Sequence, residues 1–284
     1  MIFDIIKSLR PKQWIKNLFV FAPLLFGFKY DDISLIINST IAFVSFVILS
    51  GIIYIFNDIL DIEKDKKHPK KKFRPIASGK ISIKAAYKII IVLFITLGLI
   101  IPILSIECFY IAIAYVFLNI AYSIKLKNYA IIDVIIIASG FILRLLMGGY
   151  STDISLSPWI IMTTFLLSLF LGFGKRYNEL EEISDTSRSS LNLYSKKLLD
   201  KLICISCSAT LISYALYAIE ISRESGKMEL TYTVLFVVFG LFRYLQSIYI
   251  FKKGEEPESI IYNDPIFIIN LVAWLFTTLW ILSQ

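Results

Sequence analysis

The sequence predicts an all-α, polytopic membrane protein. Its 284 residues are 57% hydrophobic with a mean hydropathy of +0.73, whereas soluble globular domains are about 45–50% apolar. The apolar residues also come in long runs, and a run of about 20 residues crosses the ~30 Å hydrocarbon layer as one helix. A soluble fold cannot bury that much apolar surface, so we expect a single transmembrane domain over residues 1–284.

Nine apolar runs are candidates for membrane crossings. They lie near residues 16–28, 33–56, 83–105, 107–124, 130–149, 157–174, 200–219, 231–251 and 264–283. The first run is short for a full crossing and contains Pro23 and Gly27, so a tilted or re-entrant helix is an alternative there. We expect a bundle of nine transmembrane helices.

Lysine and arginine residues gather in alternate loops, and cytoplasmic loops keep an excess of these residues. Opposite loops hold only Lys29, Arg223 and Lys227. We therefore expect the N-terminus and the active site to face the cytoplasm and the C-terminus to lie outside, which an odd number of crossings permits. The basic set comprises residues 7–16, 64–88, 125–127, 175–201 and 252–253.

The net charge of +7 lies mainly on this basic side of the membrane. Such a charge suits an anionic membrane surface or phosphorylated substrates. Nucleic acid is not an expected partner, because the basic residues flank the spans and no soluble domain is present to bind it. The expected partners are therefore the lipid bilayer and small phosphorylated molecules.

The stretch NDILDIEKD at residues 57–65 follows the second expected span. On a helix, Asp58, Asp61 and Asp65 are spaced i, i+3 and i+7, and Asn57 falls on the same face. Carboxylates arranged in this way repel one another unless a cation lies between them. Mg²⁺ binds a few carboxylates together with substrate phosphate oxygens, so Asp58, Asp61 and Asp65 are candidate metal ligands. Asp58 and Asp61 are the candidate catalytic pair, and Asn57 is a candidate substrate-binding residue. The alternative is a solvated acidic helix end that the following lysines neutralise.

A basic loop at residues 66–82 comes directly afterwards. Membrane orientation alone is a sufficient reason for most of its lysines. Arg74 differs because it precedes Pro75 and a turn of small residues at 77–79, where a guanidinium and backbone N–H groups could hold a phosphate. Arg74 is therefore a candidate phosphate ligand.

Two further polar clusters interrupt apolar runs at the same expected depth. Tyr122 and Lys125 end the fourth span, and Lys175, Arg176 and Glu179 follow the sixth. Lys125 could instead extend along apolar surface with its ammonium in water. We expect both clusters to border one polar cavity and to bind substrate.

Arg144 and Arg243 lie deeper within expected spans. An unpaired guanidinium is costly at that depth, so each needs a protein partner or an anion in a polar cavity. For Arg144, a pairing between helices and a contact with substrate are both open.

These motifs resemble those of the UbiA superfamily of intramembrane transferases. The resemblance extends over the whole chain and is strongest to the branch that transfers phosphoribosyl groups to polyprenyl phosphates. It implies nine transmembrane helices around a cytoplasm-facing cavity, Mg²⁺ as the cofactor, and Lys16 among the substrate-binding residues. The motifs are LRPKQWIKN (9–17), YIFNDILDIEKDKKHPKKKFRPIASG (54–79), LRLLMGG (143–149), GKRYNEL (174–180) and GEEPESIIYND (254–264).

One departure from the wider superfamily bears on the donor. Members that use prenyl diphosphates carry a second Asp-rich motif after the sixth span, where this chain has Lys175, Arg176 and Glu179. Cations in that place suit a donor with an additional phosphate, and phosphoribosyl diphosphate has one at C5. The resemblance thus implies Mg²⁺-dependent transfer of 5-phosphoribosyl from phosphoribosyl diphosphate to a polyprenyl (decaprenyl-like) phosphate, with release of diphosphate.

Two other functions are open at this point. Transfer of a prenyl chain from its diphosphate to an aromatic or other acceptor uses the same fold, but the missing second Asp-rich motif argues against it. A lipid-phosphate transporter without chemistry belongs to another class, and the carboxylate face argues against that. A homo-oligomer is compatible with the sequence, which leaves the oligomeric state open.

Overall fold

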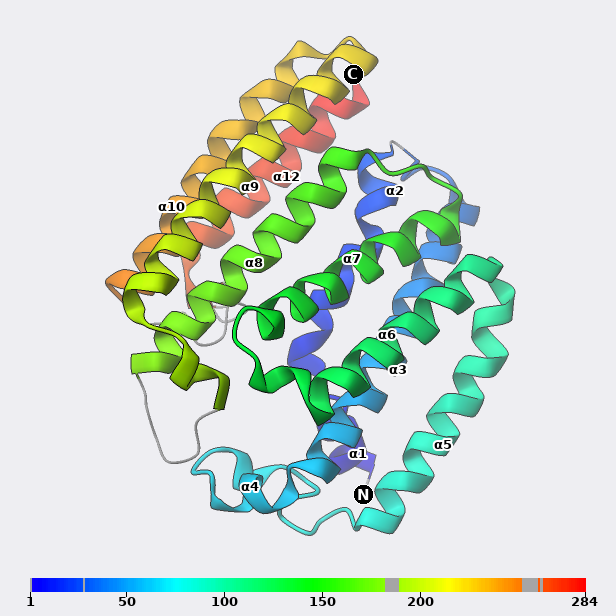
Figure 1. Cartoon of the computed structure of the whole chain (residues 1–284). Helices are drawn as coiled ribbons and strands as arrows, with labels where there is room; N and C mark the ends of the chain where they lie inside the picture. Colours follow the sequence, from blue (N-terminus) through cyan, green and yellow to red (C-terminus); the bar gives the residue numbers. More distant parts are fainter. Residues whose placement is uncertain (1, 28, 182–188, 252–259, 261–262) are drawn as a thin grey trace. The chain divides into compact units, whose positions relative to one another are not determined.

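The computed structural model describes the chain except for residues 1, 28, 182–188, 252–259 and 261–262. The described residues form helices, and no strand occurs among them (Figure 1). Lys252, Lys253 and most of the motif at 254–264 lie outside the described residues. The helices are α1 (Ile2–Ser8), η1 (Pro11–Phe21), α2 (Ala22–Phe26), α3 (Ile33–Leu60), α4 (Ile62–Lys67), η2 (Lys71–Phe73), α5 (Ile83–Ile100), η3 (Ile101–Ile103), α6 (Ile106–Ile124), η4 (Leu126–Asn128), α7 (Ile132–Thr152), α8 (Pro158–Glu181), η5 (Ser189–Leu193), α9 (Lys196–Ser225), η6 (Met228–Thr233), α10 (Val234–Tyr249) and α12 (Pro265–Ser283).

Eight helical segments in the described part of the chain are long and apolar enough to cross a membrane. They coincide with the last eight of the nine expected spans, so the prediction of an all-α membrane bundle is confirmed. The first expected span is different: its residues form a 3₁₀ helix, η1, followed by the five-residue helix α2. Pro23 and Gly27 lie in and directly after α2, and the ninth crossing stays a prediction.

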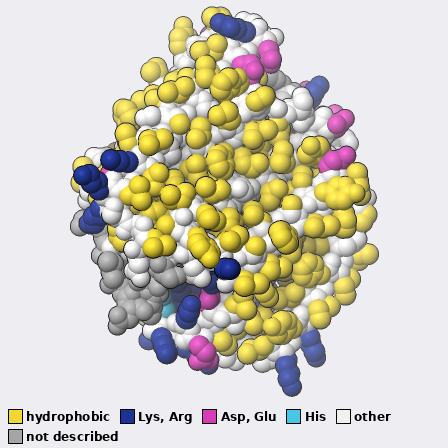
Figure 2. All heavy atoms as spheres, viewed as in Figure 1, with side chains coloured by type: hydrophobic (Ala, Val, Ile, Leu, Met, Phe, Trp, Pro, Cys, Tyr) yellow, Lys and Arg dark blue, Asp and Glu magenta, His cyan; other side chains and the backbone are white. Residues whose placement is uncertain are grey.

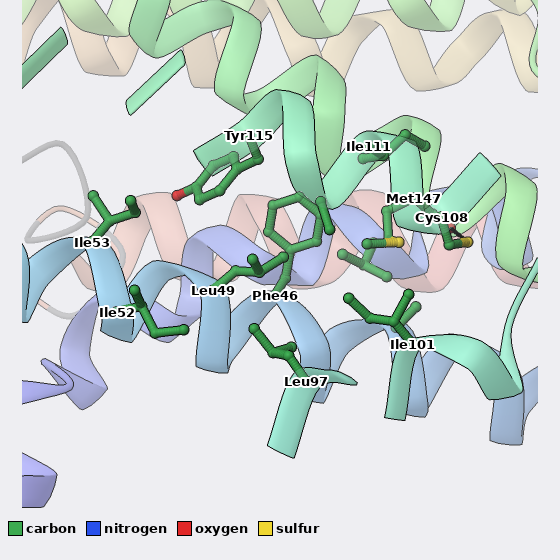
Figure 3. Packing of buried hydrophobic residues seen from close by; sticks show 13 residues of the cluster. Phe46, Leu49, Ile52, Ile53, Leu97, Ile101, Cys108, Ile111, Tyr115 and Met147 are labelled. Carbon is green, nitrogen blue, oxygen red and sulfur yellow. Dashed lines mark hydrogen bonds between the residues drawn. The ribbon is translucent and has the colours of Figure 1, made fainter. Parts of the chain in front are cut away.

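The described chain divides into two compact units. The first unit contains residues 1–127 and 143–155, and the second contains residues 128–142 and 156–284. In the first unit, α3 packs against η1, α5 and α6. The core there includes Phe46 and Tyr115, whose ring centroids lie 5.0 Å apart in an edge-to-face arrangement (Figure 3). Such a pairing adds to the stabilisation from burial alone.

The start of the chain lies against the second half of α7 at a glycine. A Cβ atom on Gly148 would lie 2.0 Å from the carbonyl oxygen of Val20 in η1. Any side chain at this position would therefore push the two backbones apart. The close approach brings η1 beside Arg144, one helical turn before Gly148, whose contacts are described below.

In the second unit, α8 packs along α9, and α10 packs against both α9 and α12. Arg243 in α10 donates from Nε to Asp264 at 2.8 Å, and Asp264 also caps α12 by accepting from the N–H groups of Ile266 and Phe267. Burial favours a raised pKa for Asp264, but the hydrogen bond and charge of Arg243 outweigh it and lower the pKa. Arg243 therefore has the protein partner that its depth in the span requires.

Apolar side chains also cover much of the outer surface. Figure 2 shows them over most of the face in view. On α5, Ile91, Ile95 and Leu99 are exposed at successive helical turns, as Leu235, Phe239 and Phe242 are on α10. A soluble protein does not present continuous apolar faces of this kind, whereas hydrocarbon chains of lipid would cover them. The protein is a multi-pass membrane protein.

We predict that Gly148→Ala lowers stability by about 1–3 kcal/mol, because the added methyl group overpacks the contact with Val20. Gly98→Ala is the matched control, since a Cβ there meets nothing within 4 Å and alanine favours helix over glycine. Thermal unfolding of both variants in the same detergent measures the difference. Equal melting temperatures for Gly148→Ala and Gly98→Ala would contradict the close approach.

Candidate active site

The Asp-rich motif spans the junction of α3 and α4. The N–H of Asp61 donates to the carbonyl of Asn57 at 2.9 Å, and the N–H of Asp65 donates to that of Asp61 at 2.8 Å. Helical hydrogen bonding thus continues through the point where α3 ends and α4 begins. This continuity keeps Asp58 and Asp65 close enough to share one partner, as expected for residues two turns apart.

That shared partner is Arg74, which follows η2. Its guanidinium Nη1 donates to Asp65 at 2.6 Å and to Asp58 at 3.1 Å. Asp58 and Asp65 are only 2% and 3% exposed, and a buried carboxylate without a partner is strongly destabilising. Arg74, chosen from the sequence as a phosphate ligand, therefore also compensates two buried carboxylates.

Arg10 is the second partner of Asp58 and was not among the site residues expected from the sequence. Its Nη2 donates to the same oxygen, Oδ1, that accepts from Arg74. The guanidinium also lies 4.7 Å from the centre of the Tyr54 ring, a cation–π contact. Arg10 adopts a left-handed backbone with φ 51°, a conformation that costs a non-glycine residue energy and persists only where surrounding contacts hold it.

The third carboxylate of the motif has a cation of its own. Lys127 donates to both oxygens of Asp61, at 3.1 and 3.2 Å. The sequence pointed instead to Lys125, which is exposed at the end of α6. Lys127 lies two residues later, in the 3₁₀ turn η4, and no pattern in the sequence distinguished the two lysines.

Arg144 is buried within the first unit. Its Nε donates to Oδ1 of Asn17 at 2.8 Å, and its Nη2 donates to the hydroxyl of Tyr115 at 3.0 Å. Its guanidinium also lies 5.3 Å from the centre of the Phe46 ring. Of the two alternatives left open for Arg144, pairing between helices is observed, and contact with substrate stays a prediction.

The second unit contains a separate buried charge cluster. Arg176 in α8 is 1% exposed and donates from Nε to Asp133 of α7 at 2.7 Å, and Asp133 is 0% exposed. Nη1 of Arg176 donates to Glu179. The guanidinium therefore lies between two carboxylates. Asp133 belongs to this cluster but was not predicted from the sequence as a site residue.

Tyr194, directly after η5, completes this cluster. Its hydroxyl donates to Asp133 at 2.8 Å and accepts from the N–H of Ile131. Burial, together with the hydrogen bond to Asp133, raises the pKa of Tyr194 above its ordinary value. The hydroxyl thus stays protonated at neutral pH and links the segment before α9 to the start of α7.

The other expected site residues are placed as follows. Lys175 lies 3.9 Å from Glu179, and its side chain is 31% exposed. Lys16 in η1, Asn57 in α3 and Tyr122 in α6 are half-buried. The structure thus joins Asp58, Asp65 and Arg74 in one group and Arg176 with Glu179 in another.

The carboxylates of the first unit suit one class of metal. No three acidic, histidine or cysteine side chains converge on one point in the part of the chain that the structure describes. Mg²⁺ does not need three, because it usually takes one or two carboxylates and completes its shell with water and phosphate oxygens. Asp58 and Asp61 offer hard oxygen ligands of that kind, so the residues fit Mg²⁺ held jointly with a phosphorylated substrate.

Comparisons with known proteins give a consistent result. The model of the UbiA prenyltransferase family matches residues 20–280. Decaprenyl-phosphate phosphoribosyltransferase of Mycolicibacterium smegmatis is 34% identical, over 98% of this chain and 92% of that protein. The protein of the same name from Corynebacterium glutamicum is 34% identical, over 95% and 84%. A UbiA homologue of Archaeoglobus fulgidus solved with GPP and Mg²⁺ has a TM-score of 0.76 at 16% identity, over 99% of this chain and 100% of that one.

We predict a strong energetic coupling between Asp133 and Arg176. Arg176→Gln leaves the buried Asp133 carboxylate without its cation, and Asp133→Asn leaves the Arg176 guanidinium with Glu179 alone; breaking a buried ion pair typically costs about 3–5 kcal/mol. The double variant removes both charges, so its loss of stability should be smaller than the sum by about 1–3 kcal/mol. Chemical unfolding of the wild type, the two single variants and the double variant in mixed micelles measures this coupling. If the stability losses of the two single variants sum to that of the double variant within about 0.5 kcal/mol, the pairing is contradicted.

Proposed function

The chain belongs to the UbiA prenyltransferase family and is a membrane-embedded transferase; from this premise we propose that it transfers 5-phosphoribosyl from phosphoribosyl diphosphate to a polyprenyl phosphate. Diphosphate is the leaving group. The names of the relatives at 34% identity support this choice of donor and acceptor. The observation that carries the proposal is the group of carboxylates and cations at the junction of α3 and α4.

This group offers both kinds of ligand that a metal diphosphate needs. Asp58 and Asp61 would hold Mg²⁺, the ion with which the UbiA homologue of Archaeoglobus fulgidus was solved. When bound, Mg²⁺ would offset the negative charge that develops on the departing diphosphate. Arg10, Arg74 and Lys127 supply fixed positive groups within the same unit, and guanidinium groups bind phosphate oxygens through paired, charge-assisted hydrogen bonds.

The reaction needs little proton transfer. In the proposed step, the bond between ribose C1 and the diphosphate oxygen breaks, and a bond forms between C1 and an oxygen of the lipid phosphate. That oxygen is already ionised at neutral pH, so no strong general base is required. The task of the chain is to position the two phosphates and to stabilise charge, and direct displacement would invert the configuration at C1.

Lys175 is the residue that we propose for recognition of the additional donor phosphate. Its side chain is 31% exposed, whereas the neighbouring Arg176 is buried between Asp133 and Glu179. The sequence prediction gave both cations this role. The contacts of Arg176 favour Lys175 for the phosphate and leave Arg176 a role in holding α8 to the start of α7.

We further propose that the group at the α3–α4 junction faces the cytoplasm. Exposed lysines surround this junction on α4 and η2, including Lys64, Lys66 and Lys72, and cytoplasmic loops retain such residues. Arg10, near the N-terminus, donates to Asp58 at this junction, so the N-terminus would face the same side. A C-terminus outside the cell completes the proposed orientation.

We predict that Asp58→Asn or Asp61→Asn lowers the transfer rate about 100-fold or more, because loss of a metal ligand removes charge stabilisation worth several kcal/mol. Glu63→Gln is the matched control, since Glu63 is exposed on α4 and pairs with Lys66. Purified protein in nanodiscs would receive labelled phosphoribosyl diphosphate, Mg²⁺ and polyprenyl phosphate, and the label in extracted lipid would be counted.

Wild type and Glu63→Gln should label the lipid at similar rates. A parallel incubation with a prenyl diphosphate and an aromatic acceptor tests the alternative reaction of the family. If product forms only in that incubation, the donor is a prenyl diphosphate and not phosphoribosyl diphosphate. Near-wild-type turnover of Asp58→Asn at saturating Mg²⁺ would instead overturn the assignment of the metal ligands.

A further inference from the structure

The carboxylates and cations at the α3–α4 junction balance in number. Asp58, Asp61 and Asp65 supply three negative charges, and each accepts a hydrogen bond from at least one cation. The cations are Arg10, Arg74 and Lys127, so the group of six side chains has no net charge. We refer to these six residues as the balanced cluster.

A divalent cation by itself is a poor addition to the balanced cluster. It would raise the local charge by two while competing for oxygens that the cations already occupy. Oδ1 of Asp58 accepts from both Arg10 and Arg74, and removing these partners from a buried carboxylate has a large cost. A metal ion alone must therefore approach carboxylates that the guanidinium groups already contact, against the repulsion of their positive charge.

The cations lie nearer to solvent than two of the carboxylates. The side chains of Arg10 and Arg74 are each 28% exposed, whereas those of Asp58 and Asp65 are 2% and 5% exposed. An anion arriving from solution therefore meets these guanidinium groups before it meets Asp58 and Asp65, whereas the side chain of Asp61 is 31% exposed. Phosphate oxygens can take over the hydrogen bonds of these groups, because guanidinium binds carboxylate and phosphate with the same paired geometry.

We infer that Arg10 and Arg74 make the binding of the metal ion and of the diphosphate group mutually dependent. Their hydrogen bonds pass from Asp58 and Asp65 to the diphosphate, and the carboxylate oxygens released in this way become available to the metal ion. The diphosphate brings the negative charge that keeps the enlarged group close to neutral. This inference rests on the proposed function and adds to it a required partnership between the two ligands.

Mutual dependence has a thermodynamic consequence. If diphosphate tightens the binding of the metal ion, the metal ion must tighten the binding of diphosphate by the same factor. The factor includes direct contact between metal ion and phosphate, so a wild-type measurement alone does not isolate the two arginines. A variant that lacks one guanidinium isolates the contribution of the arginines, because its carboxylates are partly released before any ligand is added.

The experiment measures Mn²⁺ binding by electron paramagnetic resonance, using the full-length protein in nanodiscs at fixed concentrations of free Mn²⁺. Inorganic diphosphate is the second ligand, and no turnover is required. For the wild type, we expect diphosphate to tighten Mn²⁺ binding at least about 10-fold, within the usual range of couplings. For Arg74→Gln, we expect Mn²⁺ alone to bind about 10-fold more tightly than to wild type and diphosphate to add much less.

Lys84→Gln is the matched control, because it removes one exposed positive charge at the start of α5, outside the balanced cluster. It should behave like the wild type. Arg10→Gln provides a second test of the same kind if Arg74→Gln does not fold. Equal Mn²⁺ affinity with and without diphosphate in the wild type would overturn the inference, as would an arginine variant that binds Mn²⁺ alone no more tightly than the wild type.

These outcomes separate the inference from the proposed function. Tight Mn²⁺ binding without diphosphate, together with normal labelling of polyprenyl phosphate, would contradict the coupling and support the proposed reaction. Absence of Mn²⁺ binding under both conditions, together with no labelled lipid, removes the proposed function as well.

Discussion

Compensation of buried carboxylates by cations at the end of α3 organises the first unit. Asp58 lies at the end of a membrane-spanning helix, where an uncompensated charge is expensive. Its partners come from segments far away in sequence: Arg10 precedes η1, and Arg74 follows η2. Lys127 brings the turn after α6 to Asp61 in the same way. The ion pairs thus fix three irregular segments around one acidic helix junction, which is the arrangement that a phosphate-binding site requires.

The same constraint recurs at every charged residue that we expected to need a partner within a span. Arg144 donates to Asn17 and Tyr115, and Arg243 donates to Asp264. In the second unit, Arg176 lies between Asp133 and Glu179. These pairings hold helices together, whereas the accessible cations of the balanced cluster and Lys175 are suited to an incoming anion. Burial marks Arg144 and Arg176 as structural cations, whereas Arg243, which is 19% exposed, is assigned to structure by its contact with Asp264.

Local sequence patterns predicted much of this arrangement. Eight spanning helices follow from apolar runs, because hydrocarbon thickness dictates their length. Helical periodicity placed Asp58 and Asp65 together, and helical hydrogen bonding continues past Asp61, the residue between α3 and α4. The partners Arg10 and Lys127 were missed because they lie 48 and 66 residues from the carboxylates they contact, a separation that no local pattern encodes. The close contact of η1 with Gly148 likewise joins segments that are distant in sequence.

The most direct test of the central claim is an experimental structure of the protein with Mn²⁺ and inorganic diphosphate, with the metal identified by its anomalous scattering. We predict that Mn²⁺ is bound by Asp58 or Asp61 together with diphosphate oxygens, and that Arg10 or Arg74 donates to the diphosphate in place of Asp58. Mn²⁺ bound away from both carboxylates would contradict the claim. So would diphosphate bound while Arg10 and Arg74 both keep their present contacts with Asp58.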